Sequence, residues 1–366
     1  MKTILTSLFL LSLSYINLHA DWTDKITVNG YFNVEFEDKV AGDYSGRFLD
    51  EHASFDSDML DLVFNIQATD KVRIAIDFSW EHGSQSELDK GNVGYEYAFA
   101  EYTFSDAVKI RAGKMFTPFG IYNEIHTAKP SIIILKEPNP TNKMYFISKD
   151  KYEQTTLYPR WSTGVAVLGN TEISEIPIDY VLQISNGDLS YGVEGNEFDK
   201  DDNDHKAITA RVRASLTSEL EVGASVHYDV MENYNSNDDS VGQMIINSQG
   251  LQMIWYPSDN FRLEAEFITG TLNVQGVTSF RRTGFSIVPS YYITQDINLY
   301  LLLGAADPNH NKKKDGATNI ALGANFEVAS NVFIKADLFN VQSQENNTLY
   351  KGDSYTEFRA ALSIGF

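Results

Sequence analysis

Short runs in which apolar and polar residues alternate recur along almost the whole chain. In the run from Ile26 to Phe36, most odd-numbered positions are polar and most even-numbered positions are apolar. The same period of two recurs from Val72 to Trp80 and from Tyr355 to Phe366. Alternation of this kind predicts strands that have one apolar and one polar face. About sixteen such runs, without a segment of helical periodicity, predict an all-β chain.

The connections between these runs alternate between short and long. Tight polar turns, such as 69–71 and 105–107, separate the long joins, which lie near 37–57, 81–95, 117–160, 187–205, 230–243, 270–282, 306–317 and 342–354. Short turns at one rim and long loops at the other are typical of an outer-membrane barrel. We therefore predict a transmembrane antiparallel β-barrel of about 16 strands, with both termini at the short-turn rim. A soluble sandwich or propeller is the alternative, but neither requires this alternation.

Residues 117–160, the third long join, form the longest break in the strand pattern. We call this segment the third loop. Its apolar runs Ile132–Leu135 and Met144–Ile147 need a surface to pack against. We therefore expect the third loop to fold into the lumen of the barrel. The sequence leaves open whether two of its runs form a further hairpin, which would give about 18 strands.

The amino terminus has the pattern of a secretory signal. Lys2 is a short basic start, residues 4–13 are an apolar core, and cleavage is expected before Asp21. We therefore predict a signal peptide at 1–20 and a single barrel domain at 21–366. The mean hydropathy of −0.27 is compatible with this prediction, because a membrane strand turns only every second residue toward lipid. The chain has no cysteine, so disulfides and thiolate metal sites are excluded.

Aromatic residues cluster near both ends of the expected strands. Tyr102 and Tyr291 lie beside short turns, whereas Phe267, Phe285 and Tyr355 lie near long loops. We expect two aromatic girdles at the two membrane interfaces.

The charge pattern excludes one class of partner and yields no enzyme or cofactor motif. A net charge of −21 argues against nucleic acid, whose phosphates require a basic surface. The histidines lack a zinc-site spacing and there is no G-x-S-x-G elbow, so no catalytic residues and no cofactor are predicted. The acidic run Asp199–Asp204 fails the EF-hand pattern, so no metal site is predicted. A barrel enzyme with a site assembled across loops is kept as an alternative.

Basic residues in and near the third loop are the candidates for a selective pore constriction. Charges in a narrow, poorly screened pore act strongly on passing ions. The expected constriction residues are Lys109, Arg111, Lys114, Lys129, Lys136 and Lys143. Arg73, Arg211 and Arg213 are expected on the lumen wall. The alternative for each of them is a cross-strand ion pair or a solvated side chain.

Several segments resemble one family of bacterial porins. The segments Ala98–Tyr102, Arg111–Lys114 and Thr117–Gly120 resemble the strand pair that leads into the third loop of the phosphate-selective porin O and P family. Gln183–Gly187 is similar to a later strand end of these proteins. The final strand, ending in Phe366, resembles the assembly signal that the barrel assembly machinery of Gram-negative bacteria reads.

The resemblance implies a homotrimeric channel in the bacterial outer membrane, in contact with its lipid and lipopolysaccharide. Its expected function is that of a porin, the passive diffusion of small hydrophilic solutes and the transport of ions, with a preference for anions and phosphate as one of them. The alternative is a non-conducting surface or adhesin-type barrel. In that case acidic loops such as Glu194–Asp204 would bind partners or divalent cations.

Overall fold

The computed structural model describes residues 22–43, 53–81, 93–138, 140–141, 157–187, 203–234, 240–276, 278–346, 352 and 354–366. Three features of the sequence lie wholly or largely outside these ranges. They are the expected signal peptide at 1–20, the third-loop segment that contains Lys143 and Met144–Ile147, and most of the acidic run Glu194–Asp204.

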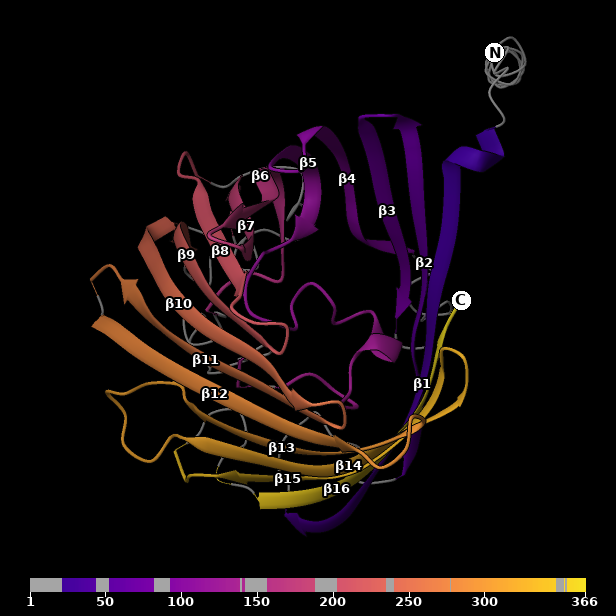
Figure 1. The fold of residues 1–366 in the computed structure, drawn as a ribbon. Helices are drawn as coiled ribbons and strands as arrows, with labels where there is room; N and C mark the ends of the chain where they lie inside the picture. Colours follow the sequence, from indigo (N-terminus) through magenta and orange to yellow (C-terminus); the bar gives the residue numbers. More distant parts are fainter. Residues whose placement is uncertain are drawn as a thin grey trace, which may run out of the picture.

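Sixteen antiparallel strands form a closed barrel (Figure 1). The strands are β1 Ile26–Asp43, β2 Ser54–Thr69, β3 Val72–Glu81, β4 Gly94–Ser105, β5 Val108–Phe116, β6 Trp161–Ile173, β7 Ile176–Ser185, β8 Ala207–Ser215, β9 Leu220–Tyr234, β10 Ser240–Ser258, β11 Phe261–Val274, β12 Thr278–Tyr292, β13 Ile297–Asp307, β14 Ala317–Ala329, β15 Val332–Ser343 and β16 Ser354–Gly365. Two short 3-10 helices, η1 Trp22–Lys25 and η2 Lys129–Ser131, accompany them. Within the described ranges, no helix is long and apolar enough to cross a membrane.

The first and last strands close the barrel. Strand β1 pairs with β16 in the register Phe32↔Ile364. Gly30 and Phe366 exchange backbone hydrogen bonds of 2.8 and 3.0 Å. The first part of β1 and the end of β16 therefore meet at the seam, on the rim of the short turns, and the prediction of a closed 16-strand barrel is confirmed.

The strands turn their apolar faces outward, as their alternation predicts. On β14, for example, Ile320 and Leu322 are exposed on the outer face, whereas Asn319 and Ala321 are buried on the lumen face. The same division holds on β16, where Leu362 is exposed and Arg359 and Ser363 are buried. An apolar outer surface over a polar lumen wall is the inverse of a soluble protein.

Several strands are longer than the alternation indicated. Long loops were expected near 230–243 and 270–282, but β9 and β10 leave only 235–239 between them, and β11 and β12 leave only 275–277. The reason is that alternation marks only the part of a strand with an apolar outer face. Beyond that part, segments such as 240–243 pair in the wall without an apolar face and therefore read as loop.

The described parts of the third loop, residues 117–138, 140–141 and 157–160, lie inside the barrel. Figure 1 shows the magenta segment after β5 crossing the interior. Ile132, Ile133 and Ile134 pack in one buried cluster with the lumen-facing side chains of β12–β16, which include Tyr300, Leu302 and Val341. The prediction that this loop folds inward is thus confirmed. Tyr355 was expected in an aromatic girdle, but its side chain faces the lumen and belongs to this cluster.

Candidate functional site

The third loop is seated on the lumen wall by apolar packing at two places. The larger cluster joins Ile132–Ile134 to β12–β16. In the smaller one, Phe119 stacks on Tyr158 with ring centroids 4.2 Å apart, and both pack with Leu157 and Ile268. Because these side chains are almost fully buried, withdrawal of the loop would expose a large apolar area to water.

Wall glycines leave room for two of these side chains. A Cβ atom at Gly250 would lie 2.7 Å from the Phe119 ring, and one at Gly270 would lie 2.7 Å from Leu157. A side chain at either position would therefore require Phe119 or Leu157 to move. The fit shows that loop and wall are shaped to each other.

Charged side chains bind the loop to β1, one of the two strands at the barrel seam, and to β15, the strand next to β16. Lys335 on β15 is buried, and its ammonium donates to the backbone carbonyl of Lys129 at 2.6 Å and to that of Ile132. From the loop side, Lys136 forms ion pairs with Glu35, at 2.8 Å, and with Glu37 on β1. Burial disfavours the charged form of Lys136, but these two carboxylates raise its pKa above the ordinary value of a lysine.

A second set of polar contacts binds the start and the middle of the loop to β11. The hydroxyl of Tyr122 donates to Glu264, and the backbone amide of Ile121 donates to Glu266. Thr141 also donates to Glu266, at 2.8 Å. Both carboxylates are buried and thus serve as acceptors for the loop.

One buried network connects the loop to three strands. Arg359 on β16 donates twice to Asp337 on β15, at 2.8 and 2.6 Å. Asp337 also accepts from the hydroxyl of Tyr300 on β13 at 2.9 Å, and that hydroxyl in turn accepts from the backbone amide of Leu135 at 3.1 Å. The network is charge-assisted at one end and reaches the loop backbone at the other.

The expected constriction residues occupy different places. Lys129 and Lys136 are in the loop, but each forms ion pairs, Lys129 with Glu137 at 3.5 Å. The ammonium group of Lys114 lies over the rings of Tyr95 and Trp161. Lys114 is four residues after Ile110, whose side chain faces outward, so it starts from the same face of β5.

Arg211 and Arg213 were expected on the lumen wall, and they lie on β8. Arg211 is buried, pairs with Glu124 of the third loop and donates to the carbonyl of Gly120 at 3.3 Å. Arg213 lies two residues closer to the end of β8, and its guanidinium is 3.8 Å from Asp179 and 3.9 Å from Glu221. Arg211 therefore helps to hold the loop, whereas Arg213 has two acidic neighbours.

Arg73 and Arg111 come together on neighbouring strands of the lumen wall. Glu101 on β4 lies between them, 3.4 Å from Arg73 and 2.8 Å from Arg111. Both guanidinium groups also lie over the Phe99 ring. Their side chains remain 35 % and 20 % exposed. Two cations share one carboxylate, so the Arg73–Glu101–Arg111 cluster has a net positive charge, and Lys109 is on the same strand face as Arg111. Asp61 and Asp77 are buried on the neighbouring strands of the same wall.

Some residues that hold the loop were not among the predicted site residues. Lys335, Asp337 and Tyr300 follow the lumen phase of their strands, and β13 carries the signal that could have identified this wall. From Leu299 to Leu303 both strand faces are apolar. A strand that is apolar on both faces is covered on both sides, and inside a barrel only a folded-in loop can supply the second cover.

Comparisons with known proteins support the barrel architecture. No family model matches the chain. An anion-selective porin from Comamonas acidovorans superposes with a TM-score of 0.63 at 11 % identity, covering 93 % of this chain and 99 % of that one. The outer membrane channel DcaP of Acinetobacter baumannii gives 0.60 at 13 %, covering 93 % and 97 %. OmpT, an outer membrane protein of Vibrio cholerae, in its trimer form gives 0.59 at 11 %, covering 93 % and 99 %. At these identities the likeness shows the fold.

One relative was found by sequence. An uncharacterized protein of Aquifex aeolicus is 24 % identical over 223 residues, which is 57 % of this chain. The match spans 45 % of that protein, less than half of its length.

Proposed function

We propose that the chain is an outer-membrane porin, a water-filled channel for the passive diffusion of small hydrophilic solutes. The observation that carries this proposal is the third loop, which is attached to the lumen wall by buried apolar packing and by ion pairs. A loop fixed in this way narrows a barrel without filling it with a separate domain. The similar structures named as a porin and as an outer membrane channel agree with this function.

We also propose that the channel prefers anions, with inorganic phosphate as one candidate. The Arg73–Glu101–Arg111 cluster supports this preference because its positive charge exceeds its negative charge and its arginines are accessible from the lumen. Lys109 adds to it. Lys129 and Lys136 act mainly by holding the loop in place, since each is paired, and Lys143 is proposed as a further basic residue of the loop.

Single-channel recording in a planar bilayer tests the proposed function. Purified protein should give stepwise increases in conductance. In a gradient of a phosphate or chloride salt, the sign of the reversal potential should show that anions permeate more readily than cations. A folded barrel that gives no steps would favour the alternative of a non-conducting surface barrel. A barrel enzyme would likewise give no steps and would require a substrate-dependent turnover.

Neutralising the arginine cluster is expected to reduce the preference for anions. In Arg73→Gln/Arg111→Gln, Glu101 stays on the wall without its two arginine partners, so the net positive charge of the cluster is lost. The anion-to-cation permeability ratio should fall by about twofold or more. Reversal potentials in a salt gradient measure this ratio. Lys25→Gln/Lys71→Gln is the matched control, because it removes two positive charges from exposed positions at the short-turn rim, and it should leave the ratio unchanged.

The membrane location predicts a depth-dependent cost for charge on the outer face. Leu322 lies in the middle of β14 and is 63 % exposed. Leu322→Arg should destabilise the barrel in lipid vesicles by about 2–4 kcal/mol, as measured by urea unfolding. Leu216→Arg, in the short turn after β8, should cost about 0–1 kcal/mol. Equal and small costs for both variants would contradict a lipid-facing wall.

The proposal extends to assembly. We propose a homotrimer, which one of the similar structures also forms, and we propose that Phe366 is part of the signal for the barrel assembly machinery. Phe366 pairs through its backbone with Gly30 at the seam, and its side chain is exposed on the outside. Native mass spectrometry of the protein in detergent tests the trimer, since a monomer mass alone would contradict it.

A further inference from the structure

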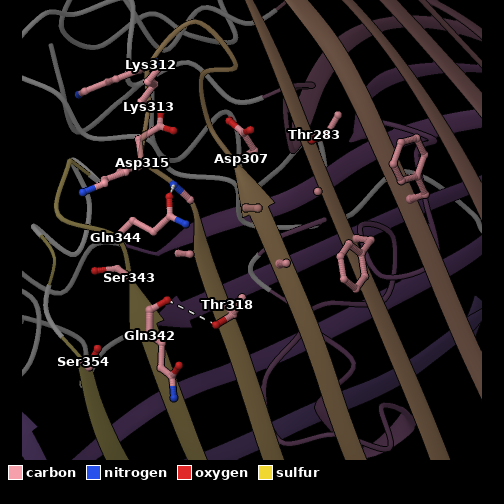
Figure 2. A pocket seen from close by; sticks show the side chains of 18 residues that line it. Thr283, Asp307, Lys312, Lys313, Asp315, Thr318, Gln342, Ser343, Gln344 and Ser354 are labelled. Carbon is pink, nitrogen blue, oxygen red and sulfur yellow. Dashed lines mark hydrogen bonds between the residues drawn. The ribbon is translucent and has the colours of Figure 1, made fainter.

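A cavity of about 820 Å³ lies at the long-loop rim, on the outside of the barrel wall (Figure 2). Its floor is one row of outward-facing residues that pair across five strands, in the order Phe267, Phe285, Ala305, Thr318 and Gln342. Phe267 and Phe285 are both about two-fifths exposed. The floor therefore begins on the apolar outer face of β11 and becomes polar toward β15.

The cover of this cavity is the loop between β13 and β14, residues 308–316, which is fixed to both sides. Toward β12, the amide of His310 donates to the carbonyl of Arg281 at 2.9 Å. Toward β15, the amide of Gly316 donates to the side chain of Gln344 at 3.2 Å, as Figure 2 shows. The side-chain amide of Asn346 donates a hydrogen bond to the backbone carbonyl of Lys313 at 2.7 Å. The cavity is thus preformed.

Lys314 has a left-handed backbone conformation that is unusual for a residue with a side chain. Its φ angle is 61°, and the residue that follows it, Asp315, is buried. Local backbone strain of this kind persists only where the surrounding structure maintains it, and it is concentrated at functional sites.

The charges around the cavity leave two lysines available. Lys314 pairs with Glu345 at 3.0 Å, and His310 lies 3.7 Å from Asp307. Asp307 and Asp315 also line the cavity. Burial, and then the nearby Asp307, raise the pKa of Asp315 to about 6, so that Asp315 is still mostly ionised at neutral pH. Lys312 and Lys313 line the cavity and make no ion pair with any described residue.

We propose that this cavity binds the phosphorylated head group of an anionic glycolipid of the outer leaflet. Lys312 and Lys313 contact the phosphate, Thr318 and Gln342 face the sugar, and an acyl chain runs down over Phe267 and Phe285. The aromatic pair places the site at the height of the membrane interface, where a basic segment attracts anionic lipid. A free phosphate ion would use only the lysines and leave the apolar end of the cavity empty.

The site rests on the proposed membrane location but not on conduction, so it can be tested in detergent. The probe is a lipid A carrying two phosphates on an acylated glucosamine disaccharide, and its binding to the full-length protein is measured by native mass spectrometry. Lys312→Gln/Lys313→Gln should weaken binding by about tenfold. Lys25→Gln/Lys71→Gln removes the same charge from the opposite rim and should bind as the wild type does.

Further probes identify which part of the lipid is recognised. Dephosphorylated lipid A and phosphatidylethanolamine should bind weakly to all variants, and inorganic phosphate should not compete. Competition by inorganic phosphate at millimolar concentration would overturn the glycolipid in favour of a simple anion site. Equal binding by the Lys312/Lys313 variant and the wild type, or an equal loss in the opposite-rim control, would overturn the site itself. Far-UV circular dichroism verifies that each variant retains the barrel.

Discussion

Arg359→Met is expected to destabilise the folded barrel by about 3–5 kcal/mol, because it leaves a buried carboxylate without its cation. Arg359 makes two hydrogen bonds to Asp337, and the side chains of both residues are almost fully buried. The hydroxyl of Tyr300 cannot replace the lost charge. Urea unfolding in lipid vesicles, followed by tryptophan fluorescence, measures the free energy of unfolding.

Two control variants separate the loss of the ion pair from a general effect of mutation. Asp337→Asn/Arg359→Met removes both charges and should recover a large part of the lost stability, because no charge is left unpaired. Arg213→Gln removes a partly exposed arginine whose ion pairs are long, and it should cost about 0–1 kcal/mol. A free energy of unfolding for Arg359→Met within about 1 kcal/mol of the wild type would contradict the role assigned to this network.

Ile134→Asp is expected to release the third loop and raise the single-channel conductance by about twofold or more. Ile134 is 1 % exposed at the centre of the apolar cluster between loop and wall. A carboxylate at this position would be buried without a partner, which costs several kcal/mol unless the loop moves away. Planar-bilayer recording of the purified variant measures the conductance.

The conservative variant at the same position shows whether the effect comes from the charge. Ile134→Val removes one methylene and should lower stability by about 0.5–1.5 kcal/mol while conductance stays unchanged. If Ile134→Asp is folded and conducts like the wild type, the third loop does not form the constriction.

The barrel could be predicted because its physical cause is local. Lipid on one side and water on the other impose a period of two on every strand, and β3 and β16 follow it over most of their length. The bounds of the strands were less predictable. On β10 the segment before Met244 has no apolar face, so its pairing with β9 depends on backbone hydrogen bonds that leave no trace in the sequence.

The candidate site was less predictable, because pairing between distant segments decides the role of each charge. The sequence shows that Lys136 is basic, but not that Glu35, about a hundred positions earlier, lies beside it. Arg73 and Arg111 are a favourable case, because successive strands bring them together through Glu101 in regular register. Lys335 is the opposite case, since its partners are carbonyl groups, which every residue has.

The contacts of the third loop have a consequence for the order of events in folding. The loop comes from the middle of the chain, yet Lys136 binds the first strand and Lys335 of the penultimate strand binds the loop. Strand β15 pairs with β16, so β15 and β1 come close to each other only when β16 pairs with β1. The contacts of the loop with β1 and with β15 can therefore form together only in the closed cylinder, whereas its packing on β12–β16 does not involve β1. A barrel whose first and last strands have not yet paired holds the third loop by only part of its contacts.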